Sequence, residues 1–105
     1  AAYEAPFPVA AAKAGARAFP LIIPTTPEAP GAAAGQRVLE ALRTDMRPKL
    51  VLWADSDPIL PLSTGRRFAE AIGTSIDHVI EGAGHFLQED AGAQIGRLIA
   101  DWLRA

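Results

Sequence analysis

The hydrophobic positions of this chain follow two different patterns, and the change comes near residue 48. Residues 1–48 are rich in alanine and proline, and the prolines interrupt short apolar stretches. Residues 49–105 instead alternate between continuous apolar runs and amphipathic segments. That alternation is typical of strands followed by helices. The second part therefore predicts an α/β fold.

In the first part, the spacing of prolines and apolar residues predicts three segments. A short helical stretch is expected over residues 9–19, between two prolines. Residues 20–31 contain four prolines and predict an extended, kinked loop. A second helix is expected over residues 35–44, where three apolar side chains fall on one face.

In the second part, two strands and two helices are expected in alternation. The run Lys49–Ala54 is continuously apolar after its first residue, which suits a strand buried on both faces. A helix over 63–72, a short strand over 76–81 and a last helix from about Asp90 follow. Strand, helix, strand predicts a right-handed parallel crossover. Because two parallel strands make a poor sheet, we expect the rest of the fold to lie upstream.

Composition excludes several classes of protein. The chain has 105 residues, a formal net charge of −2, half of its residues hydrophobic and no cysteine. No apolar run approaches the ~20 residues of a membrane span, and no secretory signal is visible. The absence of cysteine excludes disulfides and thiol chemistry. The slightly acidic charge gives no support for nucleic-acid binding. The start at Ala1, without a methionine, leads us to expect a piece of a longer protein.

A carboxylate-rich turn, Asp55-Ser56-Asp57-Pro58, directly follows the first predicted strand. In open α/β sheets, the loops at the carboxyl ends of the strands carry the active site. Asp before Pro is also common in turns, where its side chain accepts backbone hydrogen bonds. Both interpretations, a functional carboxylate and a turn cap, stay open at this point.

A histidine follows a Gly-x-Gly loop after the second predicted strand. His85 comes 28 residues after Asp57, and a crossover of that length brings the two loops to the same sheet edge. A carboxylate beside a histidine fixes its tautomer and stabilises the imidazolium during base catalysis. We therefore favour an acid–base pair. His78 is interpreted as a half-exposed strand residue. The spacing of the two histidines matches no zinc site, so no metal is expected.

The chain offers no group for this pair to activate. Gly-x-Ser-x-Gly, the nucleophile elbow of many hydrolases, is absent, and no oxyanion-hole segment is visible. The acid and the base are thus expected to serve a nucleophile supplied upstream.

Four segments together resemble the C-terminal third of haloalkane dehalogenases, members of the α/β-hydrolase superfamily. They are Tyr3–Pro8, Lys13–Pro20, Asp55–Pro58 and Gly82–Glu89. The last two also occur in other α/β-hydrolases, including epoxide hydrolases, whereas the first two point to dehalogenases. The resemblance implies the last two parallel strands with flanking helices, preceded by the end of a cap domain.

The resemblance also divides the chain and implies a reaction. Residues 1–30 would be the end of the cap region and residues 31–105 the C-terminal part of the main domain. An aspartate nucleophile displaces halide from carbon, and a histidine-activated water then hydrolyses the alkyl ester to release alcohol. His85 is similar to the general base and Asp57 to its carboxylate partner. No cofactor is implied.

The implied partners are a small halogenated alkane, water and halide, together with the N-terminal part of the fold. We expect a cytoplasmic enzyme that binds neither nucleic acid nor membrane, and a 105-residue chain that is inactive alone. Another α/β-hydrolase, such as an epoxide hydrolase, and a non-catalytic remnant are the alternatives. By resemblance, the substrate and halide pocket is lined by Phe19, Pro20, Ile23, Ile59 and Leu60.

Overall fold

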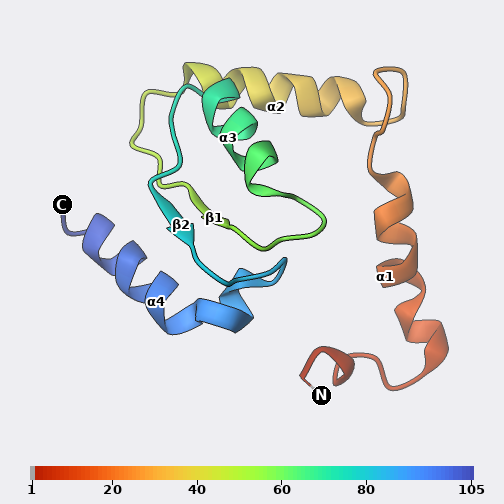
Figure 1. The fold of residues 1–105 in the computed structure, drawn as a ribbon. Coiled ribbons are helices and arrows are strands. Elements are labelled where there is room, and N and C mark those ends of the chain that lie inside the picture. Colours follow the sequence, from red (N-terminus) through yellow and green to blue (C-terminus); the bar gives the residue numbers. More distant parts are fainter. Residues whose placement is uncertain (1) are drawn as a thin grey trace. The chain divides into compact units, whose positions relative to one another are not determined.

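A computed structural model describes residues 2–105 of the chain (Figure 1). These residues form two compact units, the first extending through Val38 and the second beginning at Leu39. Within residues 2–105, no helix has the length and apolar character needed to cross a membrane. The elements, with η for a 3-10 helix, are η1 (Ala2–Glu4), η2 (Ala10–Lys13), α1 (Ala14–Ala18), η3 (Phe19–Ile22), α2 (Ala32–Thr44), β1 (Leu52–Ala54), α3 (Leu62–Ala71), β2 (His78–Ile80) and α4 (Leu87–Trp102).

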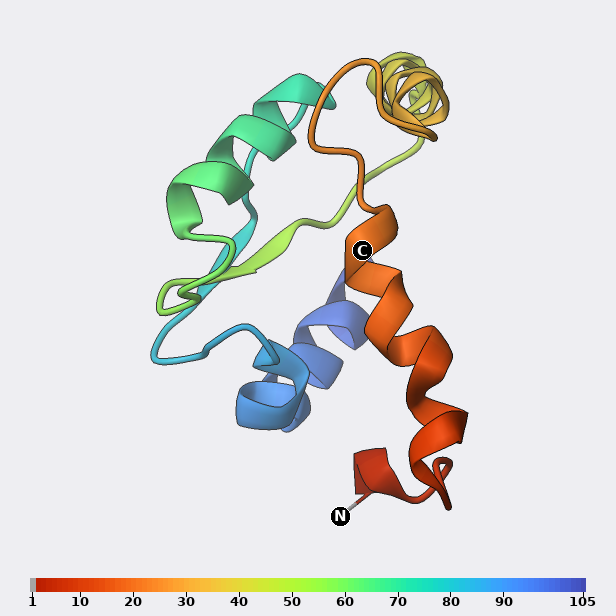
Figure 2. The ribbon, with the colours of Figure 1, turned by 90° about the vertical axis from the view of Figure 1, so that its right-hand side faces the viewer.

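The core of the second unit is a pair of parallel strands with a helix on each face. Leu52 pairs with His78 and Ala54 with Ile80, so the predicted parallel arrangement is confirmed. Helices α3 and α4 lie on opposite sides of the strands (Figure 1; Figure 2). Because side chains alternate along a strand, β1 contributes to both faces. The buried clusters are Val51, Ala69 and Ile72 towards α3, and Ala54, Ile80 and Ala83 towards α4.

Strand β1 is shorter than the apolar run that predicts it. The sequence predicts a strand from Lys49, but strand pairing begins at Leu52. Val51 is instead tied to Asp77: its N–H donates to Asp77 Oδ2 over 2.8 Å, and its carbonyl accepts from Asp77 N–H over 2.9 Å. On its other side, β1 has no partner strand within residues 2–105. Strand β2 is likewise three residues shorter than predicted.

No residue between positions 2 and 38 is buried. The predicted helix over 9–19 exists, but it starts as the 3-10 helix η2, because Val9 provides no side-chain cap. The prediction of an extended loop from Pro20 is wrong for its first three residues, which belong to η3. Proline tolerates the start of a helix, where its missing N–H has no partner to lose.

The other two helices begin about three residues earlier than predicted. Helix α2 starts at Ala32, directly after Gly31, whose φ of 89° suits glycine, and continues through Gly35. Helix α4 starts at Leu87, but Ala91 has non-helical φ/ψ, so a kink separates a first turn from the longer helix that follows the predicted start near Asp90. Acidic residues are favourable throughout the first turn because of the helix dipole, so their position does not fix the first residue.

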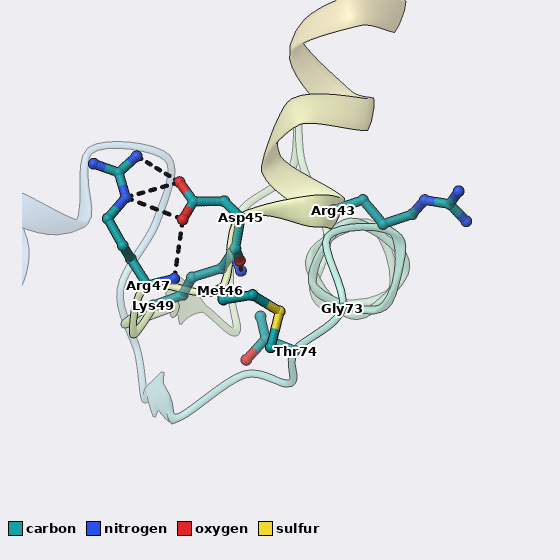
Figure 3. A pocket seen from close by; sticks show the side chains of 7 residues that line it. All are labelled: Arg43, Asp45, Met46, Arg47, Lys49, Gly73 and Thr74. Atoms are coloured by element: carbon teal, nitrogen blue, oxygen red, sulfur yellow. Dashed lines mark hydrogen bonds and ion pairs between the residues drawn. The ribbon is translucent and has the colours of Figure 1, made fainter.

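A compact polar turn joins α2 to β1 (Figure 3). Asp45 Oδ1 accepts a hydrogen bond from the backbone N–H of Arg47 over 2.9 Å, and both carboxylate oxygens contact the Arg47 guanidinium. Hydrogen bonds from this guanidinium hold the pKa of Asp45 well below its ordinary value. Arg43 points away and pairs with Glu40. Arg43 and Arg47, which line a pocket at this turn, are therefore each paired with a carboxylate, whereas Lys49, which also lines it, donates to the Asp45 carbonyl.

Because Gly65 has no side chain, the Trp53 indole can lie directly against α3. A Cβ added there would lie 2.6 Å from Cγ and Cε2 of the Trp53 indole, far inside van der Waals contact. We expect Gly65→Ala to lower the free energy of unfolding by about 1–3 kcal/mol, because the ring must leave its place. Urea unfolding of the purified chain measures this.

Gly96→Ala is the matched control for this substitution. Gly96 is also helical, in α4, but its added Cβ meets nothing within 4 Å. Alanine should therefore raise the free energy of unfolding, by about 0.5–1 kcal/mol, through helix propensity alone. Equal effects at the two glycines would contradict the proposed close contact of Trp53 with α3.

Candidate active site

The Asp57 carboxylate organises the loop that follows β1. Its Oδ1 accepts hydrogen bonds from the backbone N–H groups of Ile59, over 2.7 Å, and Leu60, over 2.9 Å. Pro58, between Asp57 and Ile59, has no N–H to donate. The side chain of Asp57 is only 7% exposed. The turn therefore directs one oxygen into the backbone and leaves Oδ2 for another partner.

The loop after β2 lies beside the Asp57 loop because backbone pairing continues beyond the strands. Ser56 N–H donates to the carbonyl of Ala83 over 3.1 Å. Asp55 Oδ1 accepts from the N–H of Gly82 over 2.8 Å. Gly82 has a φ of 70°, which only glycine adopts without strain, and Ala83 is buried. The chain is thus turned so that His85 faces the Asp57 loop.

Asp57 and His85 meet at this edge of the strand pair. The distance from Oδ2 of Asp57 to Nδ1 of His85 is 2.9 Å. An ionised carboxylate only accepts hydrogen bonds, so Nδ1 of the imidazole must donate. Nε2 then carries the lone pair of the neutral ring and is available as a base. The His85 side chain is 34% exposed, so small molecules can reach it.

The same contacts set the ionisation of Asp57. Burial alone would raise its pKa, but hydrogen bonds from Leu60 N–H, the His85 ring and Ile59 N–H, together with the His85 charge, lower the pKa below its ordinary value. The carboxylate consequently stays charged throughout the neutral range.

This lowered pKa predicts a pH-dependent contribution to stability. A carboxyl whose pKa is lower in the folded than in the unfolded chain stabilises the fold at any pH above ~3.9, the pKa of Asp in the unfolded chain. That contribution disappears as the pH falls through the folded pKa. Urea unfolding should show a stability difference between wild type and Asp57→Asn that shrinks as the pH falls from 5 towards 3. A difference that grows over this interval would contradict the assignment.

Two further contacts hold the histidine loop. Asp90, in the first turn of α4, accepts a hydrogen bond at Oδ2 from the N–H of Gly84 over 2.8 Å. The Phe86 ring stands edge-on to the His85 imidazole, with 5.2 Å between centroids. The backbone before His85 and the His85 ring are therefore each restrained by a further contact.

The residues assigned to the pocket from the sequence fall into two groups. Ile59 and Leu60 belong to the Asp57 loop, beside the acid–base pair, and their side chains are exposed. Phe19 and Pro20 lie in η3 and Ile23 directly follows it, all in the first unit and all exposed. Within the second unit, Asp57, Ile59, Leu60 and His85 share one edge.

Sequence reasoning missed three groups that shape this site. Trp53 donates its indole N–H to the Leu60 carbonyl over 2.9 Å. Asp55 links the two loops, where the sequence offered a turn cap. Asp90 anchors Gly84, where the sequence offered a helix start. An acidic residue after a Gly-x-Gly loop was the available signal for the last of these.

Comparison with known proteins agrees with this architecture. The family described as alpha/beta hydrolase fold matches residues 10–92. Haloalkane dehalogenase 1 of Mycobacterium tuberculosis H37Rv is 37% identical over 106 residues, which cover all of this chain and 35% of that protein. A haloalkane dehalogenase of Psychrobacter cryohalolentis is also 37% identical, over 97% of this chain and 34% of its own length. One of Mesorhizobium japonicum is 31% identical over 96% of this chain. The chain thus spans about a third of these relatives and matches their C-terminal part.

Proposed function

Because the chain belongs to the alpha/beta hydrolase fold family, we propose that it forms the acid–base part of a haloalkane dehalogenase. Relatives bearing that name are similar to this chain over essentially its whole length. The nucleophile and most of the substrate cavity would come from the part of the fold that these relatives have beyond the matched third.

The observation that carries this proposal is the 2.9 Å contact between Asp57 Oδ2 and His85 Nδ1. Both residues follow parallel strands at their carboxyl ends, where α/β sheets place their active sites. A buried, ionised carboxylate fixes the imidazole tautomer and stabilises the imidazolium that forms when Nε2 accepts a proton. This is the arrangement that a general base needs.

The reaction has two chemical steps. In the first, an aspartate of the missing part attacks the carbon that bears the halogen, so a carbon–oxygen bond forms and halide leaves with the carbon–halogen electron pair. In the second, Nε2 of His85 takes a proton from water as the water oxygen attacks the ester carbonyl. Alcohol leaves, the nucleophilic carboxylate is regenerated, and the imidazolium returns its proton to solvent.

The apolar residues near the pair suit such a substrate. Ile59 and Leu60 expose aliphatic side chains beside Asp57, and we propose that they line the cavity for the alkyl group. We propose the same role for Phe19, Pro20 and Ile23, at the end of a cap region over residues 1–30. A dry apolar cavity favours carboxylate attack because it removes water that would solvate the nucleophile.

A chimaera tests the proposed function. It joins the part of the Mycobacterium tuberculosis relative that precedes the matched segment to all 105 residues of this chain. We expect it to release bromide and alcohol from a short brominated alkane over many turnovers. The unmodified relative serves as the positive control.

Three outcomes would contradict the proposal. A folded chimaera that releases no more than one equivalent of halide would show that this chain cannot supply the acid and base. A chimaera whose halide release is unchanged by loss of His85 would favour the non-catalytic remnant. Hydrolysis of an epoxide with no action on the bromoalkane would favour the epoxide hydrolase alternative.

A further inference from the structure

We propose that Trp53 is a positioning residue for the catalytic carboxylate, because its indole N–H clamps the loop from which Asp57 reaches His85. The inference rests on the proposed function only in naming Asp57 as the acid. Its basis is the set of contacts around Leu60, which no packing role of a tryptophan requires.

Both polar groups of the Leu60 backbone are held by hydrogen bonds. Its N–H donates to Asp57 Oδ1 over 2.9 Å, and its carbonyl accepts from Trp53 Nε1 over 2.9 Å. The Leu60 side chain is 42% exposed and that of Ile59 65%, so side-chain burial anchors this loop weakly. The two hydrogen bonds therefore form a continuous link from the indole to the carboxylate.

The indole is itself fixed by its neighbours. It lies so close to Gly65 that no side chain fits between the ring and α3. The Phe68 ring contacts it with centroids 6.4 Å apart. Its backbone pairs with Val79 in the strand ladder. A ring held by strand, helix and a second ring is a rigid donor, and the loop aligns on it rather than the reverse.

The two carboxylate oxygens of Asp57 therefore have different partners. Oδ1 is occupied by the turn that Trp53 holds in place, which leaves Oδ2 directed at His85 Nδ1. Without the indole donor, the Leu60 backbone is no longer restrained at its carbonyl, and the N–H that Oδ1 accepts from becomes less fixed. The carboxylate then samples orientations in which neither oxygen meets the imidazole.

Trp53→Phe separates this role from packing, because it keeps an aromatic ring over Gly65 and removes only the donor. The readout is the ratio of the two neutral His85 tautomers, measured by ¹⁵N NMR of the 105-residue chain and, in parallel, of the chimaera. We expect the Nδ1–H form to lose about twofold to tenfold relative to the Nε2–H form, the effect of one neutral hydrogen bond. The exposed His78 provides an internal control that should not change. In the chimaera, kcat should fall by a similar factor with KM unchanged.

Trp102→Phe is the matched variant, since it removes the chain's other indole, at the end of α4. It should leave the His85 tautomer ratio and kcat within twofold of wild type. A Trp53→Phe chain that is folded and keeps the wild-type tautomer ratio would overturn the proposal. Because the tautomer is read without substrate, this result is distinct from failure of the dehalogenase assignment.

A second measurement decides the question if Trp53→Phe does not fold. Coupling between two groups is reciprocal, so Asp57→Ala should free the Leu60 backbone and thereby withdraw its carbonyl from the Trp53 indole N–H. We expect hydrogen exchange of the Trp53 indole N–H to accelerate at least several-fold, with that of Trp102 unchanged. Unaltered exchange at Trp53 would overturn the proposal.

Discussion

His85→Ala in the chimaera is expected to reduce steady-state halide release by about 10²–10⁴-fold. Nε2 of His85 is the proposed base for the water that cleaves the ester, and alanine leaves that water without a proton acceptor. The displacement step needs no base, so one equivalent of halide should still appear rapidly. Stopped-flow halide detection resolves this burst from the lost turnover.

His78→Ala is the control for this prediction. His78 is the chain's other histidine and is exposed on β2, outside the site. Its replacement should leave both the burst and the turnover within about twofold of the unmodified chimaera. If His85→Ala removed the burst as well, His85 would act before the ester forms, contrary to the proposed mechanism.

Asp57→Asn is expected to give the second largest loss, also about 10²–10⁴-fold in kcat. The amide oxygen can still accept from Ile59 and Leu60, so the turn should survive. The amide N–H₂ would then face His85 Nδ1 and donate to it. That contact favours the tautomer with the proton on Nε2, which can no longer accept one from water.

Asp77→Asn provides the comparison. Asp77 accepts from Val51 N–H at the opposite end of the strands, and an amide oxygen can do the same. Activity should stay near that of the unmodified chimaera. An Asp57→Asn chimaera with nearly full activity would remove Asp57 from the mechanism, whatever its geometry.

The fold was predictable where hydrophobic periodicity reports on burial. The parallel pairing of β1 with β2 and the two flanking helices follow from apolar runs separated by amphipathic segments. The end of β1 at Ala54 was predicted as well, but its start was not. The apolar run from Lys49 suits a strand with two neighbours, whereas pairing within residues 2–105 starts at Leu52. The 3-10 helix η3 was also missed, since Pro20 serves equally at a helix start and in a loop.

The contact between Asp57 and His85 was predictable because parallel topology brings the two residues to one edge. The contacts that hold the two loops in place were not predictable. The link from Trp53 to Leu60 depends on an indole lying flat against Gly65, a three-dimensional contact between positions twelve apart with no local signature. Asp55 and Asp90 each carry a backbone contact that the sequence could only describe as turn or helix-start chemistry.

The mass of the His85→Ala chimaera after exposure to a brominated alkane tests the central claim most directly. If this chain supplies the base of a haloalkane dehalogenase, intact-protein mass spectrometry should show one added alkyl group per molecule. That ester should persist, whereas the unmodified chimaera under the same conditions should show little of it. A folded His85→Ala chimaera that gains no alkyl group, or loses it as fast as the unmodified protein, would contradict the account.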